Sequence, residues 1–482
     1  MPLVVFLCAN ARKESYIMET EVSKKMPEKN KMGTMAMGTL LITMSLPLML
    51  SMLTEALYNV VDSLFVSRVG EAAITALSMA FPVQLLIVSI TVGTGVGINA
   101  LLSRQLGSGN RAEVDKAAAN GIFLAVITYF IFLVLGLFCV APYYLSQTTE
   151  RAVCEYGTDY LSICLVWSFG GIGQITFQRL LQSTGRTALS MVSQLSGAFI
   201  NIVLDPLLIF GMCGMPAMGV KGAAIATVTG QIAALCLAIY FNLRFNSEIR
   251  FKLRGFFPDW RVIKNIYAIG APAILMQSLN SMMAFGVNLI LIGISSTAVA
   301  AFGIYLKVQN FIFMPAFGLN NAVIAIAAFN YGAGNKARVH QVIGYGMFYA
   351  SLIMLAGTFL VHIFAASLLG LFEASPELLK TGIPAMRIIS LSYIFTGYML
   401  IAQGVYQALG NGIYSLAVTL LRVVVVLLPS LWIFTRILPL HDVWWAFVVS
   451  EVISALISAV LLRKIIAAKM GSTAKSLCED YI

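Results

Sequence analysis

The sequence contains little charge. Only 11% of its 482 residues are charged, 59% are hydrophobic, and the mean hydropathy is +0.88. Soluble domains carry about 25% charged residues, so this composition excludes an ordinary soluble protein. The chain is predicted to be an integral membrane protein.

Motifs for catalysis and metal binding are also absent. The sequence has no P-loop GxxxxGK[ST], which argues against ATP-driven pumping, and neither HExxH nor GxSxG occurs. The seven cysteines form no CxxC pair, and the three histidines are too dispersed to form a metal cluster. We therefore expect neither an enzyme nor a resident cofactor.

The chain does contain long hydrophobic segments. A spanning helix needs about 20 apolar residues, and twelve such segments are centred near residues 53, 88, 129, 165, 200, 232, 278, 313, 356, 392, 425 and 454. They show no strict alternation of polar and apolar residues, which favours helices over a transmembrane barrel. The predicted fold is an all-α membrane protein with twelve transmembrane helices.

Positive charge is concentrated on one side of the predicted membrane. With the N-terminus inside, 23 of the 31 Lys and Arg residues fall in inside segments, Arg179 among them, and five fall in outside segments. The other three are within spans: Lys307, Arg387 and Arg422. The positive-inside rule then places both termini in the cytoplasm. This distribution accounts for the net charge of +10 without a nucleic-acid partner.

The sequence contains one internal repeat. The residue numbers of its two copies differ by a constant 225, which we call the repeat offset. At this offset Gln84 meets Gln309, Gly107 meets Gly332, and RQLGSGN is matched by FNYGAGN. Each half holds six spans, so the two halves enter the membrane in the same direction and form two pseudo-symmetric six-helix lobes. The GSGN and GAGN loops suit tight turns with positive φ.

The repeat gives predicted domain boundaries. They are a flexible cytoplasmic segment (1–33), a first lobe (34–244), a cytoplasmic linker (245–261), a second lobe (262–466) and a cytoplasmic tail (467–482).

The first span carries acids in a place where lipid disfavours them. Each ionised carboxylate near the centre of a spanning helix costs about 2.5 to 3.5 kcal/mol on insertion scales, so such residues usually face an interior path. One face of this helix holds polar side chains at helical spacing: Ser51, Glu55, Tyr58 and Asp62.

The fifth span is polar as well. Asn201 and Asp205 share one helical face, and Pro206 cannot donate a hydrogen bond to the carbonyl of Ile202, so we expect the helix to open locally there. Asp62, Asp205 and Thr227 each lie six residues from the outer end of their spans. They are therefore expected at one depth, as a hydrophilic cluster in the first lobe.

The repeat separates this cluster from the scaffold. At the repeat offset, Asp62 corresponds to Val287, Asp205 to Ser430 and Thr227 to Val452. Acids that only held the fold together would be expected in both halves. Asp62 and Asp205 are therefore predicted to be functional.

Other polar residues leave alternatives open. Glu55 lies two turns deeper than Asp62, where it would attract a cation in a central cavity. Glu451 has Lys307, Arg422 or Arg387 as possible partners, and the sequence does not choose among them. The candidate substrate-binding residues are Glu55, Tyr58, Gln84, Gln309 and Glu451.

Several motifs together resemble the multidrug and toxic compound extrusion (MATE) family, most closely its MepA-like bacterial branch. The resemblance covers residues from about 40 to 465 and rests on five stretches: LYNVVDSLFVSRVG, RQLGSGN, QSTGR, NIVLDPLLIFG and GVKGAAIAT. It implies a V-shaped pair of lobes, in a bacterial cell membrane, that exports cationic amphipathic drugs in exchange for Na⁺ or H⁺. The working unit is expected to be a monomer.

The resemblance also assigns residues. The family's first-lobe cation site falls on Asp62, Asn201, Asp205 and Thr227, which would hold Na⁺ if the exchange uses it, and its bending proline falls on Pro47. One branch of the family has acids in spans 7 and 10. The approximately corresponding residues here are Asn280 and Tyr398, so a second-lobe cation site of that type is not expected.

Two other functions are compatible with the sequence. A lipid-linked oligosaccharide flippase would share the lobes and the repeat, but it would be expected to have a strongly cationic cavity, whereas the buried charges predicted in the first lobe are acidic. A cation channel could use intramembrane acids instead. Passive single-channel currents would identify it.

Overall fold

The computed structural model describes residues 30–251, 256–372 and 374–470, which form helices joined by short connections, with no strand among them. The first half contains α2 (Lys31–Thr34), α3 (Met37–Ser67), α4 (Glu71–Gly107), α5 (Arg111–Phe138), α6 (Val140–Gln147), α7 (Arg151–Val166), α8 (Phe169–Ser183), α9 (Thr187–Phe210), η1 (Met212–Gly214) and α10 (Val220–Phe245). The second half contains α11 (Trp260–Ile292), α12 (Ser296–Gly332), α13 (Lys336–Gly370), α14 (Pro376–Ser390), α15 (Tyr393–Ala408), α16 (Gly412–Leu420), the π-helical segment η2 (Leu421–Leu427), α17 (Leu428–Ile437) and α18 (Trp445–Met470).

Within the described ranges, ten helical stretches are long and apolar enough to cross a membrane, α16, η2 and α17 together forming one of them. Two further spans are bent pairs: α7 and α8 meet at 42°, and α14 and α15 meet at 47°. With each bent pair counted as one span, the total is the predicted twelve. The predicted all-α fold class is confirmed.

The helix boundaries follow the internal repeat. α4 and α12 start at Glu71 and Ser296 and end at Gly107 and Gly332, so both pairs of ends are separated by the repeat offset. The starts of α10 and α18 have the same separation, as do those of α9 and α16. The repeat found in the sequence is therefore a repeat of the fold.

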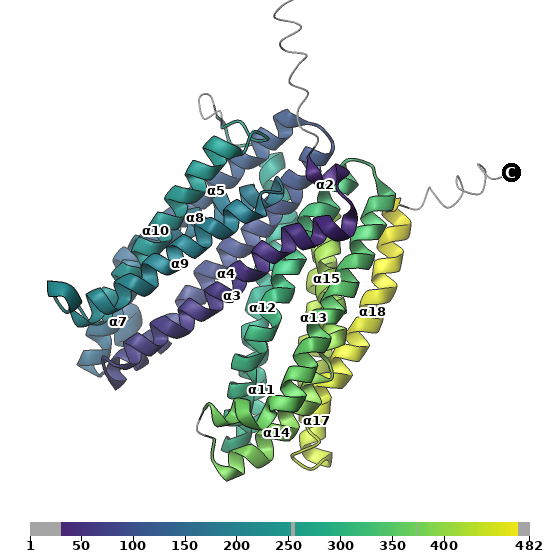
Figure 1. Cartoon of the computed structure of the whole chain (residues 1–482). Helices are drawn as coiled ribbons and strands as arrows, with labels where there is room; N and C mark the ends of the chain where they lie inside the picture. Colours follow the sequence, from purple (N-terminus) through teal and green to yellow (C-terminus); the bar gives the residue numbers. More distant parts are fainter. Residues whose placement is uncertain (1–29, 252–255, 373, 471–482) are drawn as a thin grey trace, which may run out of the picture.

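The two halves form separate lobes that meet at one end. We call α3 to α10 the N-lobe and α11 to α18 the C-lobe; in Figure 1 they approach each other at the top and diverge toward the bottom. One hydrophobic cluster contains residues of both lobes, such as Leu40 and Leu319. Two further clusters belong to one lobe each, around Phe132 in the N-lobe and Trp444 in the C-lobe. We call the joined end, where α4 and α12 finish, the closed end.

Glycines allow the lobes to touch at the closed end. A Cβ atom on Gly107 would collide with the carbonyl oxygen of Phe329, and one on Gly332 would collide with the carbonyl oxygen of Arg104. Arg104 and Phe329 are themselves equivalent positions of the repeat, so the two contacts are related by the pseudo-twofold axis. Two helices can cross this closely only where a side chain is missing.

The turns after these glycines behave as predicted. Gly109 has φ +75° and Gly334 has φ +71°, in the left-handed region that glycine tolerates. Asn110 and Asn335 then cap the next helices, since their side chains accept from the backbone N–H of Glu113 and Arg338.

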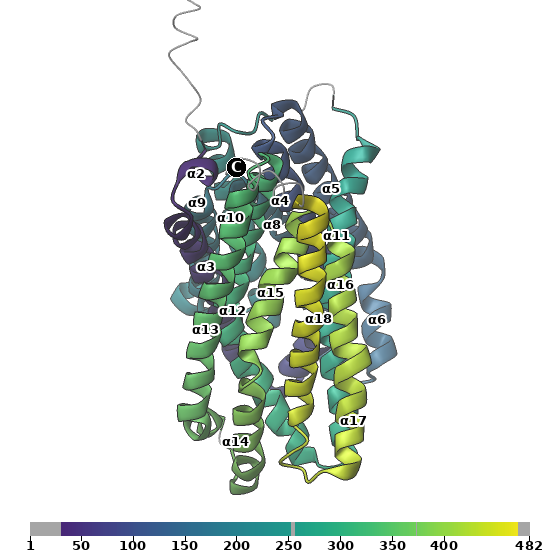
Figure 2. The same ribbon diagram turned by 90° about the vertical axis from the view of Figure 1, so that its right-hand side faces the viewer.

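The short helix α2 bridges the lobes at the closed end. Asn30 Nδ2 donates to the carbonyl oxygen of Thr184 in the N-lobe at 3.1 Å. From the C-lobe, Arg338 donates to the carbonyl oxygens of Met32 and Met35, at 3.1 and 2.8 Å. Figures 1 and 2 show α2 and the last turn of α18 at this same end of the molecule.

The structure changes some predicted boundaries. Most of the predicted flexible segment, residues 1–29, lies outside the described residues, but Met32 is fully buried, so the end of that segment belongs to the packed fold. Residues 252–255 of the predicted linker also lie outside the described ranges. α18 continues to Met470, past the predicted end of the second lobe at 466, and the remaining tail is not among the described residues.

Candidate functional site: a cation site and its polar surroundings

Asn201 connects two helices of the N-lobe. Its Nδ2 donates to Oδ1 of Asp205, one turn along α9, at 3.3 Å, and to Oγ1 of Thr227 on α10 at 3.4 Å. α9 and α10 approach closely because Gly197 and Gly230 face each other, and a Cβ on either would collide with the carbonyl oxygen of the other. Three of the four predicted coupling residues are therefore in direct contact.

Asp62 of α3 completes the cluster, because it interacts electrostatically with Asp205. Three buried oxygens have no hydrogen-bond partner among the described residues: Oδ1 of Asp62, Oδ1 of Asn201 and Oδ2 of Asp205. Asp205 is fully buried. A buried polar atom without a partner costs about 1 to 3 kcal/mol, so this group of oxygens favours the binding of a proton or a cation.

The fifth span differs from its prediction in one respect. α9 is a continuous helix from Thr187 to Phe210 with Pro206 inside it, so the expected local opening is absent. The loss of a single hydrogen bond at Pro206 is tolerated because close packing against α10 holds the helix on both sides of the proline. Asn201 and Asp205 consequently keep regular one-turn spacing.

A small cavity lies beside this cluster. Its volume is ≈ 20 Å³, which is about the space that one water molecule needs. The lining comes from α3, α8, α9 and α10 and comprises Tyr58, Gln174, Gln194, Gly197, Ala198, Asn201, Thr227, Gly230 and Gln231. Tyr58, predicted to bind substrate, is thus placed next to the cation cluster.

Buried amides and hydroxyls continue from the cavity toward the closed end. Gln174 and Gln178 both donate to Oε1 of Gln194, the latter at 3.0 Å, and Gln182 donates to Oγ of Ser190 at 3.0 Å. We call these residues and Ser193 the glutamine ladder; all of them are buried. The spacing of Gln174, Gln178 and Gln182 at i, i+4 and i+8 was a signal for it in the sequence.

Arg179 lies beside the glutamine ladder, and its predicted position was wrong. It is only 4% exposed in α8, its Nη1 donates to Oε1 of Gln182 at 3.0 Å, and it interacts electrostatically with Glu55. Arg179 is therefore a buried charge of the N-lobe and not part of an inside segment. Among the described residues of the N-lobe, the fully buried charged side chains are one acid, Asp205, and one base, Arg179.

The other candidate substrate residues of the N-lobe occupy different surroundings. Glu55 is half-buried on α3, near Arg179. Gln84 on α4 donates to the hydroxyl oxygen of Tyr160 at 3.1 Å, and Tyr160 interacts electrostatically with Asp62. Gln84 thus belongs to the outer environment of the cation cluster.

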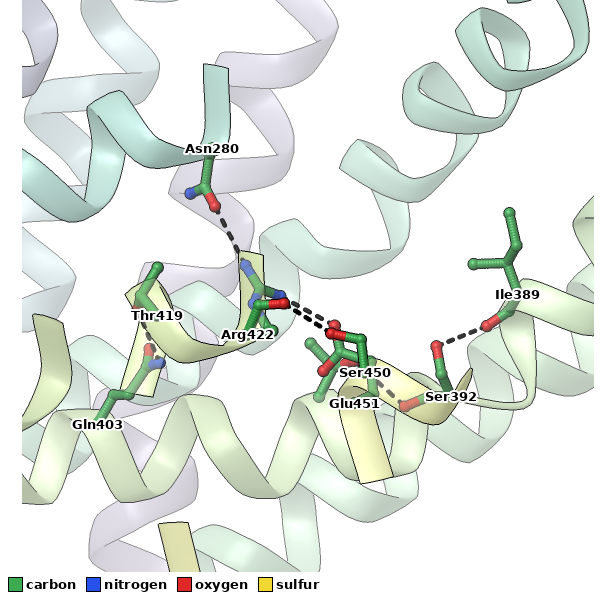
Figure 3. A network of polar contacts seen from close by, with 9 residues as sticks. Asn280, Ile389, Ser392, Gln403, Thr419, Arg422, Ser450 and Glu451 are labelled. Atoms are coloured by element: carbon green, nitrogen blue, oxygen red, sulfur yellow. Dashed lines mark hydrogen bonds and ion pairs between the residues drawn. The ribbon is translucent and has the colours of Figure 1, made fainter. Parts of the chain in front are cut away.

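In the C-lobe, the structure resolves which partner Glu451 has. Arg422 Nη1 lies 3.0 Å from Glu451 Oε1, and Arg422 Nη2 donates to Oδ1 of Asn280 at 3.2 Å (Figure 3). Lys307 instead lies 5.4 Å above the ring of Phe372. Gln309 is half-buried on α12. Of the partners that the sequence left open for Glu451, Arg422 forms the ion pair.

Pro47 lies where α3 crosses the C-lobe. The backbone of Leu48 and Met49 packs against Gly318 so tightly that a Cβ there would collide with it. The Oγ of Ser51 donates to the carbonyl oxygen of Pro47 at 3.0 Å. A bend at Pro47 would therefore move the part of α3 that carries Glu55 and Asp62 relative to a fixed crossing point.

Comparison with known protein families matches the MatE family model to residues 47–207 and 272–433, one match in each half of the chain. The chain belongs to the MatE family. The two matches begin at Pro47 and Pro272, which are equivalent positions of the internal repeat, so the family unit coincides with that repeat.

Several curated members of the MatE family are similar to this chain. An FAD transporter of Shewanella oneidensis is 27% identical over 84% of this chain and 89% of its own length. The probable multidrug resistance protein NorM of Thermotoga maritima is 25% identical over 82% and 85%. The multidrug export protein MepA of Staphylococcus haemolyticus is 25% identical over 86% and 90%.

Solved MATE structures share the fold. A multidrug resistance MATE transporter in an outward-facing conformation superimposes with a TM-score of 0.87 at 24% identity, covering 93% of this chain and all of the other. A MATE structure in a bent conformation gives a TM-score of 0.84 at 24% identity, over 91% of this chain and 98% of that one.

The N-lobe cluster of this MatE protein has a definite chemistry. Its donors are two carboxylates, one amide and one hydroxyl, so every possible ligand atom is an oxygen. Oxygen donors suit hard cations, and two nearby carboxylates also suit a shared proton. The site can therefore take up one small cation or one proton within the membrane.

Proposed function

We propose that this protein is a multidrug efflux transporter that exports cationic amphipathic compounds by antiport with Na⁺ or H⁺. Membership of the MatE family and the similarity to proteins named as multidrug exporters support this function. The observation that carries the proposal is the cluster of Asp62, Asn201, Asp205 and Thr227, in which buried acidic oxygens have no partner among the described residues.

The coupling ion acts by neutralising this cluster. Ionised Asp62 and Asp205 repel each other, and a proton or Na⁺ between them removes the repulsion. Binding draws α3 toward α9 and α10, bends α3 near Pro47, and shrinks the space between the lobes so that the drug is expelled. Drug and ion are coupled because each favours a different arrangement of the same lobe.

The glutamine ladder gives the ion a second route. It lies between the cavity beside Asn201 and the closed end of the N-lobe, and it consists of a hydrogen-bonded group around Gln194 and a separate pair, Gln182 and Ser190. A proton, or a cation with its water, can exchange partners along such a chain. The ion can then leave along the ladder on the side opposite to the one where it binds when the lobes rock, so that its release stays coupled to their movement.

Substrate selection uses the space between the lobes. Half-buried Glu55 is the carboxylate best placed on α3 to attract a cationic drug, although Arg179 offsets part of its charge. The proposed setting is a bacterial cell membrane, with both termini in the cytoplasm, so that the lobes diverge toward the outside. The working unit is a monomer.

Transport in sealed vesicles tests this proposal. Inside-out vesicles with imposed Na⁺ or pH gradients should accumulate ethidium or a fluoroquinolone only when the correct gradient is present. Asp62→Asn and Asp205→Asn should each lose the part of this drug accumulation that the gradient drives. Wild-type rates in both variants would contradict the coupling mechanism.

A flavin dinucleotide exporter is the second candidate. It is favoured by the similarity to an FAD transporter and by two arginines inside the lobes, namely Arg179, which is buried, and Arg422, whose side chain is 16% exposed. The same vesicles separate the two functions: uptake of FAD that ethidium does not compete with would favour the flavin exporter.

A further inference from the structure

In the C-lobe, a charged side chain lies close to the region that corresponds to the cavity of the N-lobe. At the repeat offset, Arg422 corresponds to Gly197, which lines the N-lobe cavity, and Glu451 corresponds to Ala226, which neighbours Thr227. The offset applies to these helices because the starts of α9 and α16 are equivalent positions of the repeat, as are those of α10 and α18. The Arg422 side chain therefore projects from the position at which the N-lobe has Gly197 packed against Gly230.

The side chain of Arg422 is held like a bound ion. Its guanidinium contacts Glu451 of α18 at 3.0 Å and Asn280 of α11 at 3.2 Å, and the Arg422 carbonyl accepts from Ser450 Oγ at 2.8 Å (Figure 3). The side chains of Arg422 and Glu451 are only 16% and 12% exposed. Asn280 is the repeat counterpart of Glu55, so the three elements are those that surround the cation cluster in the other lobe: spans 1, 5 and 6 there, spans 7, 11 and 12 here.

The backbone is adapted to this arrangement. Arg422 lies in the π-helical segment Leu421–Leu427, and the span that contains it has 26 residues where α9 has 24. A π-helical turn turns the following side chains relative to a regular helix and is frequent at functional sites. Arg422 thus lies at the start of a local distortion that α9, with its regular helix, lacks.

We propose that the Arg422 guanidinium is a tethered cation, with Glu451 as its counter-ion, in the part of the C-lobe that corresponds to the region beside the N-lobe cation site. The role of this fixed cation rests on the proposed ion-coupled function. The binding of a guanidinium group beside Glu451 can be tested without transport. A lobe that carries its own cation does not respond to the external ion. Only the N-lobe then binds the coupling ion, and the C-lobe does not change with the ion gradient.

The proposal predicts that a free cation can replace the tether. Arg422→Gly restores the N-lobe residue and leaves Glu451 facing an empty acidic pocket. The probe is methylguanidinium chloride, added to the purified full-length chain in detergent, and the readout is the thermal unfolding midpoint. All variants carry Asp205→Asn in addition, so that the N-lobe site does not contribute to the response.

Methylguanidinium should raise the unfolding midpoint of Arg422→Gly with saturation, at a concentration at least about tenfold below any effect on the Arg422 parent, as expected for a ligand that binds only the folded state. Arg422→Gly/Glu451→Gln should lose the response, because the counter-charge is gone. Arg387→Gly, which removes an exposed arginine from α14, is the matched control and should behave like the parent. Equal responses of Arg422→Gly and its parent would overturn the proposal, as would a response that survives Glu451→Gln.

A second comparison covers the case in which Arg422→Gly does not fold. Arg422→Gln leaves Glu451 without its cation, whereas Arg422→Gln/Glu451→Gln removes both charges. The double variant should have the higher unfolding midpoint, and a midpoint no higher than that of Arg422→Gln would contradict the tether. Neither measurement involves transport, so a failure of the proposed antiport would appear in the vesicles and not here.

Discussion

Where α9 of the N-lobe has Gly197 beside a small cavity, the corresponding position of the C-lobe has Arg422 in an ion pair with Glu451. Where the N-lobe has Asp205 next to Asn201, the C-lobe has Ser430 and Val426. The helices that carry these residues nevertheless begin at equivalent positions in both halves. The two lobes therefore share their scaffold and differ in the charged residues that they bury and in the positions of those residues.

This difference shows which features the two copies of the repeat have in common. Gly107 and Gly332 are present in both halves because each must let another helix approach. Residues that line the interior of a lobe are under no such constraint, since a side chain there is limited by its neighbours within that lobe. The interior of each lobe can consequently have a different function. We therefore expect matched substitutions to have unequal effects inside the two lobes and equal effects where the lobes cross.

The largest difference between matched substitutions in the two lobes is expected at Asp205. Asp205→Asn removes the buried charge that a coupling ion neutralises, and gradient-driven drug efflux should fall by about a hundredfold, near the upper end of typical coupling free energies. The matched change in the other lobe is Ser430→Asn at the repeat offset, which should keep gradient-driven efflux. Initial rates in vesicles with and without the gradient measure both.

If Ser430→Asn lowered the gradient-driven rate as much as Asp205→Asn, the asymmetry of the lobes would be wrong. Drug binding measured without any gradient provides a further control. Asp205→Asn should still bind ethidium, because the proposed substrate site lies between the lobes and not in the cation cluster.

Equal effects are expected where the lobes cross. Gly107→Ala and Gly332→Ala each place a Cβ against a backbone carbonyl of the opposite lobe, and overpacking of this kind costs about 1 to 3 kcal/mol. Both variants should show lowered unfolding midpoints of similar size. Gly344→Ala in α13 is the matched control, because a Cβ there meets nothing within 4 Å.

Thermal unfolding of the purified proteins at one scan rate compares these three variants. Gly344→Ala should match or slightly exceed the wild type, since alanine is favoured over glycine in a helix. A midpoint for Gly107→Ala equal to that of Gly344→Ala, or clearly different from that of Gly332→Ala, would contradict the pseudo-symmetric crossing.

Much of the N-lobe cluster was predictable by counting residues. Asp62, Asp205 and Thr227 each lie six residues from the residue that marks the outer end of their span in the sequence, and a straight helix rises by about 1.5 Å per residue. The structure then places Asn201 in contact with both Asp205 and Thr227. Counting succeeded because α3, α9 and α10 are unbroken.

The remaining features depend on departures from straight helices. α7 and α8 form one bent pair from Arg151 to Ser183, which is longer than a span of about 20 residues, so Arg179 lies within that pair and inside the N-lobe. In the C-lobe, Arg422 lies in a π-helical segment, and only the arrangement of the helices in space selects it as the partner of Glu451. Neither the bend nor the π-helix has a clear signal in a single sequence.

The smallest predicted difference between matched substitutions in the two lobes concerns the glutamine ladder. Gln194→Leu leaves the amides of Gln174 and Gln178 without their shared acceptor, and its counterpart Thr419→Val removes the acceptor of Gln403 in the C-lobe. Each change exposes a buried amide to the same kind of penalty, about 1 to 3 kcal/mol, so both variants should lose similar amounts of thermal stability. Only Gln194→Leu should also slow gradient-driven efflux, by about fivefold, the lower end of coupling effects. Efflux rates normalised to the amount of folded protein separate stability from coupling, and an equal slowing by Thr419→Val would show that the ladder supports the fold and does not conduct the ion.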